Sequence, residues 1–418
     1  MHSQHAIAVI GAGVIGSAVA YALAREGWRV LLVDRADPGI AGASFGNAGH
    51  IAAELLEPLP SRALLLGFWR ELTAFGGPLE IPPRRVAAFL PWAARFSVAA
   101  FRRTRHTRFL APLVRESVTA LDRLLGDMRR RDLLRRNGHY EVWLGAKADA
   151  GASVQTDTMR RLEVRTEPAP SELLAAVRRT AGSAHAAGLW FPGCAHVVDP
   201  LEVVRAFAAA AAGCGAAIVR REVRALRRVG DAFAIDTDAE TLAADAVVVC
   251  AGAWSARLLT PLLAKKWGAS VPLESVRGYH VEMPGQAPLI DAPVLYADRS
   301  ILVTPMTGRL RASSFMEFRP PDAPADVSKY ARLRAALGTL GYAVDAAAPA
   351  WVGPRSVLPD YLPAIGRLSA APNLYYAFGH QHIGLTLAAI TAECMAALVA
   401  GRTPSVDLAP FAIERFGS

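Results

Sequence analysis

The hydrophobic pattern of residues 6–35 predicts a strand, a glycine-rich turn, a helix and a second strand. Apolar residues 6–10 lead into the segment Gly11-Ala12-Gly13-Val14-Ile15-Gly16, and the helix-like stretch that follows ends at Gly27. A second apolar run, WRVLLV, leads directly to Asp34. This order of elements is typical of a nucleotide-binding βαβ unit.

The pattern predicts further elements along the whole chain. Residues 37–50, DPGIAGASFGNAGH, are too long and too rich in small residues for a simple turn, so we expect a binding loop. Residues 244–255, ADAVVVCAGAWS, predict a buried parallel strand that ends in a small-residue turn. The remaining predictions are helices within 58–136, 200–213 and 327–343; a strand at 139–145; paired strands at 216–229 and 232–238; an antiparallel sheet over 271–318; and a strand, glycine loop and helix over 373–402, ending at Gly401.

Nucleotide-binding elements are thus expected at both ends of the chain and in its middle. A length of 418 residues is enough for two domains. We predict an α/β fold combined with antiparallel β structure. A discontinuous Rossmann-like domain would comprise residues 1–57, 185–265 and 345–418, and a second, substrate-binding domain would comprise 58–184 and 266–344, with a mostly antiparallel sheet and helices.

Composition and charge add little to this picture. Hydrophobic residues make up 52% and charged residues 20%, which is typical of a folded globular protein. The net charge is +9, and arginine is concentrated in residues 84–136. Such a region is either a surface for anionic lipid or nucleic acid, or a set of solvated helix faces. The signatures of nucleic-acid binding are missing, so we expect no nucleic-acid partner.

The spacing of the cysteines and the length of the apolar runs indicate which cellular compartment to expect. The four cysteines are scattered without a CxxC pair, and His380 and His382 lack an evident third ligand, so we expect neither a disulfide framework nor a metal. The N-terminus has no signal-peptide pattern, and no apolar run is long enough to span a membrane. We expect a cytoplasmic protein, with a peripheral contact to the inner face of the cell membrane as an additional expectation.

The glycines of the first motif have separate tasks. Gly11 permits the tight turn, Gly13 allows the backbone to approach a pyrophosphate, and Gly16 allows the helix to pack closely on the strand. Asp34 can accept hydrogen bonds from ribose hydroxyls and would repel a 2′-phosphate, which disfavours NADP. Three further segments favour FAD over NAD: GASFGNAGHI, DAVVVCAGAWS and FGHQHIGLT. The last provides a second helix N-terminus, which can stabilise the negative charge of a reduced flavin.

These segments, together with VRGYHVEM, WVGPRSVLPDYLPAIG and PNLYYAFGHQHIGLTLA, resemble the D-amino acid oxidase superfamily of FAD enzymes, and within it the bacterial D-amino acid dehydrogenases. The resemblance spans nearly the whole chain in family order. It implies FAD, oxidation of an amine next to a carboxylate, and a set of cofactor contacts. Those contacts are Gly11, Gly13, Val14, Ile15, Gly16, Asp34, Arg35, Ala43, Ser44, Asn47, Gly49, His50, Val223, Ala251, Gly252, Trp254, Gly353, Arg355, Gly379, His380, Ile383, Gly384, Leu385 and Thr386.

Two positions depart from the family pattern. The family more often has Glu where Asp34 stands, and Ser356 replaces the proline that usually follows the arginine of its G-x-R-P segment. Some relatives hold FAD through a cysteine near PRSVLPD. This sequence has none there, so we expect non-covalent FAD.

The expected reaction passes a hydride from the substrate Cα to flavin N5 and leaves an imine. Arg355 is the candidate to bind the substrate carboxylate, since a guanidinium binds a carboxylate through two parallel hydrogen bonds. Tyr279, His382 and His50 are the other catalytic candidates, for the pocket wall or for taking the amine proton. His280 is a further candidate for the same roles.

Several alternatives stay open. GHQHIG with NAGHIA most resembles the D-hydroxyproline-type dehydrogenases, so the first expectation is a cyclic D-amino or imino acid. A broad dehydrogenase for D-alanine and similar amino acids is the alternative. An RNA-modifying flavoenzyme and a non-enzymatic FAD-binding subunit represent other classes. The electron acceptor (a quinone, an electron carrier or O2), the oligomeric state and the need for a partner subunit cannot be read from the sequence.

Overall fold

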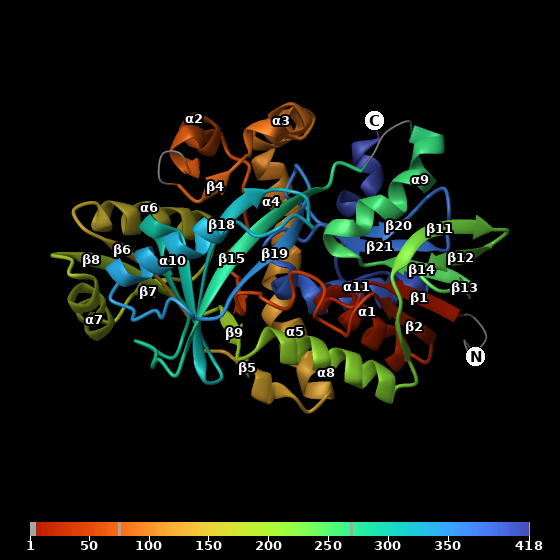
Figure 1. Cartoon of the computed structure of the whole chain (residues 1–418), viewed down its shortest axis with the longest axis horizontal. Coiled ribbons are helices and arrows are strands. Elements are labelled where there is room, and N and C mark those ends of the chain that lie inside the picture. The colour runs from red at the N-terminus through yellow and green to blue at the C-terminus, as the bar shows by residue number, and fades with distance from the viewer. Residues whose placement is uncertain (1–5, 74–76, 268–270, 418) are drawn as a thin grey trace.

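The computed structural model describes residues 6–73, 77–267 and 271–417. Figure 1 shows two sheet systems at opposite ends of the long axis, with helices between them. In the described part, no helix combines the length and apolar character that crossing a membrane requires.

A six-stranded sheet forms the nucleotide-binding end of the molecule. Its first five strands are parallel, and the last pairs antiparallel with its neighbour. In spatial order the strands are β10 (Ala217–Arg220), β2 (Arg29–Asp34), β1 (Ala6–Ile10), β14 (Ala246–Val249), β21 (Leu374–Phe378) and β20 (Ala364–Arg367). Segments more than 200 residues apart are therefore neighbours in one sheet.

The two faces of this sheet bury different partners because strand side chains alternate between faces. Ile7 and Val9 pack towards helices α1 (Val14–Arg25), α8 (Pro200–Gly213) and α11 (Gly384–Val399). Ala8 and Ile10 pack on the opposite face, in a core shared with a small antiparallel sheet and helix α9 (Ser255–Trp267). That small sheet contains β11 (Val223–Val229), β12 (Ala232–Thr237) and β13 (Thr241–Ala244).

A nine-stranded sheet forms the other end. Its pairings are antiparallel, apart from β16 with β6 and β4 with β18. In spatial order it contains β19 (Ala350–Val357), β15 (Glu274–Pro284), β18 (Arg309–Phe318), β17 (Ile301–Met306), β16 (Val294–Tyr296), β6 (His139–Leu144), β8 (Ala186–Phe191) and β7 (Glu167–Pro168), while β4 (Leu79–Glu80) joins at β18. Helices α6 (Ala148–Arg161), α7 (Ser171–Ala181) and α10 (Val327–Thr339) pack against it.

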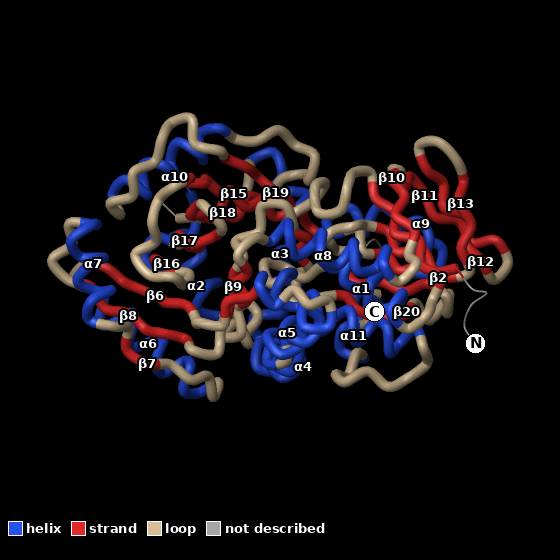
Figure 2. The backbone as a smooth tube through the Cα atoms, turned by 90° about the horizontal axis from the view of Figure 1, so that it is seen from below, coloured by secondary structure: helices blue, strands red, loops and turns tan. Residues whose placement is uncertain are grey.

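Helices α2 (Arg62–Glu71), α3 (Val86–Phe101), α4 (Arg103–Arg115) and α5 (Ser117–Asp127) link the two ends. Figure 2 shows α4 and α5 beside α11, and Arg123 on α5 donates two hydrogen bonds, of 2.8 and 2.7 Å, to Glu393 on α11. A short sheet of β3 (His50–Ile51), β9 (Ala195–Val197) and β5 (Leu134–Arg135) lies at the junction.

Most predicted elements are confirmed, including the strand–turn–helix–strand unit at 6–34 and the terminal strand, loop and helix. The predicted pairing of residues 216–229 with 232–238 is wrong in its first half. Ala217–Arg220 instead pairs with β2 and extends the parallel sheet, and only the strand from Val223 pairs with β12. Alternation within the segment cannot distinguish these partners, because both pairings bury one face of a strand.

Strand pairing also differs from the predicted domain boundaries at two places. Residues 186–191 form β8 and residues 350–357 form β19, and both strands pair within the nine-stranded sheet although the boundaries assign them to the nucleotide domain. Neither segment carries a local signal for its pairing with β6 or β15, since these strands lie about 40 to 80 residues away in the chain.

Candidate active site

A cavity of about 870 Å³ lies where the carboxyl ends of the parallel strands meet the nine-stranded sheet. This edge is where open α/β sheets bind ligands. The cavity wall combines the Gly11–Ile15 turn, the 39–50 loop, the start of β11, residues 250–254, and the segments around residues 355 and 382. Its volume is within the range of cofactor and ligand sites.

The first turn is shaped by close backbone contacts. Gly11 has φ +103°, and a Cβ there would stand 2.4 Å from the carbonyl oxygen of Cys250. A Cβ on Gly16 would stand 1.7 Å from the Gly11 carbonyl oxygen. These contacts place the N-terminus of α1 at the cavity, where the N-cap residue Gly13 has no side chain and Ser44 Oγ accepts from the Val14 N–H at 2.9 Å. The remaining N–H groups of such a helix N-terminus, together with its positive dipole charge, are available to an anionic group.

Asp34 and Arg35 follow β2 at the rim of the cavity. The Asp34 carboxylate accepts hydrogen bonds from the backbone N–H groups of Ala12, at 2.7 Å, and Ala36, at 3.1 Å. Burial raises the pKa of this carboxyl, and the two hydrogen bonds oppose the rise. The Arg35 guanidinium lies 4.2 Å from the centre of the Trp254 ring. The carboxylate therefore has a fixed orientation, with lone pairs left for a ribose.

The loop after β2 is anchored at both of its sides. Ser44 Oγ accepts a 2.9 Å hydrogen bond from the Val14 N–H, and Asn47 Oδ1 accepts one of 2.8 Å from the Gly49 N–H. On the side of the nine-stranded sheet, Arg311 donates to the Asn47 carbonyl oxygen at 2.6 Å. The loop thus forms a fixed wall between the two sheets, and Ala43 lines the cavity with it.

The C-terminal loop supplies the second helix N-terminus. Helix α11 begins at Gly384, with Ile383 as N-cap and no side-chain cap, and Gly384 and Leu385 line the cavity. His380 Nε2 lies 3.1 Å from Thr391 Oγ1, and burial lowers the pKa of this imidazole to about 3. Two helix N-termini from opposite ends of the chain therefore face one cavity, which suits a long dinucleotide with anionic groups at two places.

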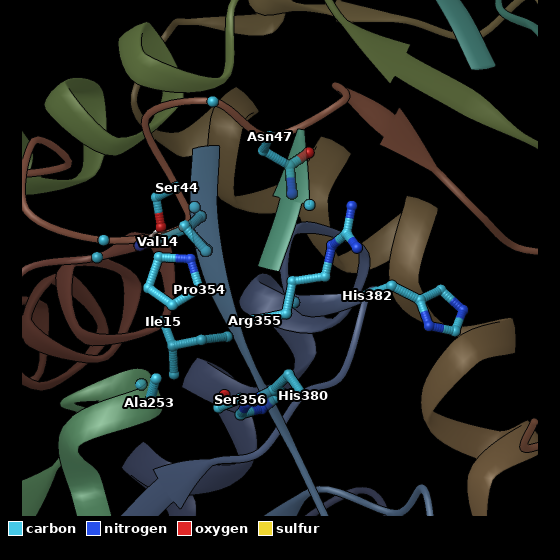
Figure 3. A pocket seen from close by; sticks show the side chains of 18 of the residues that line it. Val14, Ile15, Ser44, Asn47, Ala253, Pro354, Arg355, Ser356, His380 and His382 are labelled. Atoms are coloured by element: carbon cyan, nitrogen blue, oxygen red, sulfur yellow. Dashed lines mark hydrogen bonds between the residues drawn. The ribbon is translucent and has the colours of Figure 1, made fainter. Parts of the chain in front are cut away.

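Arg355 on β19 enters the cavity from the nine-stranded sheet, and Figure 3 shows its extended side chain there. Its guanidinium lies against Gly278, where a Cβ would stand 2.0 Å from a guanidinium nitrogen. It donates a 3.1 Å hydrogen bond to the carbonyl oxygen of Phe315. Among the described residues, no carboxylate oxygen lies within 4.0 Å of it, and burial lowers its pKa. This cation lacks a protein counter-ion and faces the cavity.

The other catalytic candidates have different surroundings. His382 lines the cavity with an accessible ring, and the surrounding protein, helped by the charge of Arg355, lowers its pKa to about 4. Tyr279 is 1% exposed, and its hydroxyl donates to Glu317 at 2.7 Å and accepts from Arg277 at 3.2 Å and from the Asp326 N–H at 3.1 Å. That hydroxyl is fully engaged, so the structure does not support a role in taking a proton from a substrate.

His50 lines the cavity, and His280 lies behind its wall against the Gly46 backbone. His50 Nε2 lies 3.8 Å from Glu54 Oε1, and burial lowers the pKa of this imidazole to about 3. His280 Nδ1 lies 3.0 Å from the carbonyl oxygen of Gly46, and its ring stacks on Trp351 with 5.3 Å between centroids. The His280 ring thus contacts the 39–50 loop through Gly46.

Most of the predicted cofactor contacts line the cavity. They are Gly11, Gly13, Val14, Ile15, Asp34, Arg35, Ala43, Ser44, Asn47, His50, Val223, Ala251, Gly252, Trp254, Gly353, Arg355, His380, Gly384 and Leu385. The structure places five others behind the cavity wall: Gly16, Gly49, Gly379, Ile383 and Thr386. Each supports the wall by packing or by a hydrogen bond, as Thr386 does when its Oγ1 accepts from the Ala52 N–H at 3.0 Å.

Trp351, Phe315 and Gln381 are among the wall residues that the sequence did not predict. Trp351 fits against Gly46 and Gly353, where a Cβ would stand 2.0 and 1.7 Å from its ring. Phe315 and Gln381 line the cavity with φ of 66° and 54°, which non-glycine residues rarely adopt. The small size of Gly46 and Gly353 makes room for the Trp351 ring. This relationship can be recognised only once the pairing of distant segments is known.

The comparisons with known proteins agree with this site. Residues 6–398 match the model of the DAO family, described as FAD dependent oxidoreductase. The chain belongs to this family, and FAD is its cofactor. A D-amino-acid oxidase of Bradyrhizobium diazoefficiens is 30% identical, over 98% of each chain. D-amino acid dehydrogenase 2 of Pseudomonas aeruginosa is 28% identical, over 96% of each chain.

Solved structures show the same fold. Glycine oxidase from Geobacillus kaustophilus aligns with a TM-score of 0.76 at 23% identity, over 99% of each chain. L-proline dehydrogenase from P. horikoshii aligns with a TM-score of 0.71 at 17% identity, over 100% of this chain and 98% of that one. The predicted fold class, cofactor and enzyme class are confirmed: the protein is an FAD-dependent oxidoreductase, and oxidation of an amine is the activity that its family and relatives support.

Proposed function

We propose that the protein oxidises a D-amino acid whose carboxylate is held by Arg355. The single observation that carries this proposal is a guanidinium that has no counter-ion among the described residues, inside the cavity that the two helix N-termini share. The curated relatives named above, which are named for D-amino acids and match over nearly their whole lengths, support the D configuration.

Substrate orientation is the main task of these residues. The bond from Arg355 to the Phe315 carbonyl oxygen sets the plane of the guanidinium and leaves its other N–H groups for a carboxylate. FAD, when bound, accepts the hydride from Cα. Fixing the carboxylate aligns Cα with the cofactor, and orientation of this kind can contribute several kcal/mol to a rate enhancement.

His382 is suited to accept a hydrogen bond from the substrate amine. Its pKa of about 4 keeps the imidazole neutral at neutral pH, so that a ring nitrogen is available as an acceptor. The same positive charge that helps to lower this pKa, on Arg355, also attracts the substrate carboxylate.

The cofactor is held non-covalently in this proposal. Of the four cysteines, only Cys250 lines the cavity. Burial raises the pKa of its thiol, so the thiolate needed for attack on a flavin does not form at neutral pH.

A cyclic secondary amine such as D-hydroxyproline or D-proline is the finer proposal. It is supported by the loop sequences GHQHIG and NAGHIA, both of which border the cavity. Oxidation of D-alanine and similar linear amino acids is the alternative within the same chemistry.

A membrane quinone is the proposed electron acceptor, with helices α2 and α3 as the contact surface. Of the eleven large apolar side chains exposed in the described part, six lie on these helices. They are Leu66, Trp69, Val86, Leu90, Val98 and Phe101. Residues 81–115 contain eight arginines and no Asp or Glu. Apolar and basic groups together suit an anionic lipid surface. Glu71 on α2 also lines the cavity, so this surface borders the site.

An anaerobic screen of D- and L-amino acids, cyclic and linear, tests the proposal by following the loss of the yellow flavin absorption. We expect D-proline and D-hydroxyproline to bleach the flavin fastest, D-alanine more slowly, and L-amino acids hardly at all. Faster bleaching by linear D-amino acids would select the alternative. Bleaching by L-amino acids alone would overturn the proposal.

A further inference from the structure

Four metal-ligating side chains meet beside the cavity, away from Arg355. They are His50, Glu54, His139 and Cys194, and their ligand atoms all lie within 4.8 Å of one another. Three distant segments bring them together. His50 on β3 pairs with His196 on β9, two residues after Cys194, and the Gly138 N–H donates to the Cys194 carbonyl oxygen at 3.2 Å.

The cluster is buried and poorly satisfied. The side chains of His50, Glu54 and His139 are 10%, 6% and 1% exposed, and Cys194 is 2% exposed. One hydrogen bond links the group, from Cys194 Sγ to Glu54 Oε2 at 2.9 Å. His50 Nε2, which faces Glu54, is buried without a hydrogen-bond partner. A buried polar atom without a partner is costly, so a ligand that uses this lone pair would offset the cost.

The cluster also lacks a compensating cation. Among the described residues, the basic groups within 4.0 Å of the Glu54 carboxylate are the imidazoles of His50 and His139. A second acidic cluster, Glu80, Glu317 and Asp326, differs because Lys329 pairs with all three carboxylates.

We propose that His50, Glu54, His139 and Cys194 bind a divalent transition metal of the zinc type. Two imidazoles, a carboxylate and a thiolate are the donor types that Zn²⁺ uses, and four of them complete a tetrahedron. Both imidazole Nε2 atoms lie 3.8 Å from Glu54 Oε1, close to the distance of about 3.4 Å between ligands on bonds of about 2.1 Å. Thiolate and carboxylate together neutralise the charge of the ion.

Four protein ligands leave no open position, so the metal is structural rather than catalytic. It would tie the end of the 39–50 loop to β6 and to the segment before β9, and so hold one wall of the cavity. Binding displaces the proton of the Cys194 thiol, which passes to the solvent. Phe191, stacked 4.5 Å from the His139 ring, fixes the orientation of that ligand.

Metal content of the purified holoenzyme tests the proposal directly. After zinc loading and gel filtration, mass spectrometry of the metal should find about one equivalent per chain. Cobalt loading should produce d–d bands at wavelengths longer than the flavin absorption. It should also produce a thiolate-to-cobalt charge-transfer band. Cys194→Ser is nearly isosteric and should weaken affinity more than about 100-fold. Cys214→Ser, at an exposed cysteine, is the matched control and should bind as the wild type does.

Two results would overturn the proposal: less than about one-tenth of an equivalent in the loaded wild type, or equal binding by the wild type and Cys194→Ser. Flavin content and circular dichroism of each variant check that it is folded. Glu54→Gln keeps the shape of the side chain and should lose the metal as well. The measurement needs no substrate, so its failure is distinct from a failure of the proposed function.

Discussion

Arg355 donates a 3.1 Å hydrogen bond to the carbonyl oxygen of Phe315, a residue whose φ is 66°. The register of β18 against β15 shifts at this point, between Arg277 and Tyr279 of β15. A bulge of this kind re-aims the backbone, and backbone strain is typical of functional sites. The strained carbonyl therefore presets the orientation of the guanidinium before a substrate binds.

Replacing Arg355 should impair substrate binding without removing the flavin. We expect Arg355→Ala, and to a smaller degree Arg355→Lys, to raise KM and to lower kcat/KM at least about 100-fold, because the bidentate contact with the carboxylate is lost. Arg332→Lys is the control, since Arg332 lies over the Phe315 ring at 5.3 Å. Steady-state kinetics with the best D-amino acid of the screen would test this. An unchanged KM in Arg355→Ala would contradict the assigned role.

Two glycines of the first turn should respond differently to alanine. At Gly13 the added Cβ would stand 3.1 Å from Ser44 Oγ, which is a movable side-chain atom. At Gly16 it would stand 1.7 Å from a backbone oxygen. We expect Gly13→Ala to fold but to hold FAD weakly, and Gly16→Ala to be unstable. Flavin absorbance relative to protein, together with thermal unfolding, measures both. Equal stability of the two variants would refute the distinction.

His382 should determine the acidic limb of the pH profile. Its pKa of about 4 is low, so the imidazole is neutral over most of the working range and loses its acceptor nitrogen only near pH 4. We expect log kcat/KM to fall as the pH approaches 4 in the wild type, and this limb to be lost in His382→Gln together with part of the activity. An identical profile in both proteins would show that another group controls the acidic limb.

Glu141 should make the fold less stable as pH rises. Burial raises the pKa of this carboxyl to about 8, above the usual value of 4.5, so the folded state binds more protons than the unfolded state between these values. Stability from this group is complete below pH 4.5 and is lost as pH rises towards 8, at no more than about 1.4 kcal/mol per pH unit. In the wild type, Gln155 Nε2 donates a 2.9 Å hydrogen bond to the Glu141 carboxyl. Glu141→Gln removes the titrating group and keeps an oxygen that accepts this bond.

Urea unfolding at several pH values compares the two proteins. The variant should gain stability relative to the wild type as pH rises from 5 to 8. A constant difference over this range would show that the carboxyl titrates normally.

The apolar surface of α2 and α3 should determine binding to membranes. Substituting Leu66, Leu90 and Phe101 with serine removes exposed apolar area while leaving the buried core untouched, since these side chains are 84%, 59% and 64% exposed. In a flotation assay, we expect less of the triple variant than of the wild type to bind anionic vesicles. Val154→Ser, at another exposed position on α6, should bind as the wild type does. If the wild type does not bind anionic vesicles at low salt, the proposal that α2 and α3 form a membrane-binding surface is wrong.

The sequence predicted the parts of the site that depend on short-range contacts. The turn at Gly11–Gly16 needs Gly16 to clear the carbonyl of Gly11, and both belong to one strand–turn–helix unit. Asp34 likewise reaches back to Ala12 within the same unit. The C-terminal loop and α11 follow a similar local pattern, so the spacing of glycines and apolar residues was enough to locate both helix N-termini.

Only the tertiary structure decided which distant groups share a partner. Tyr279 was a catalytic candidate by sequence, but the pairing of β15 with β18 places Glu317 at 2.7 Å from its hydroxyl. The meeting of His50, Glu54, His139 and Cys194 likewise depends on strand pairing across three segments. Local pattern specifies elements because it reflects steric contacts and burial along a few turns of chain. Which side chains satisfy one another is determined by long-range packing, which no window of sequence contains.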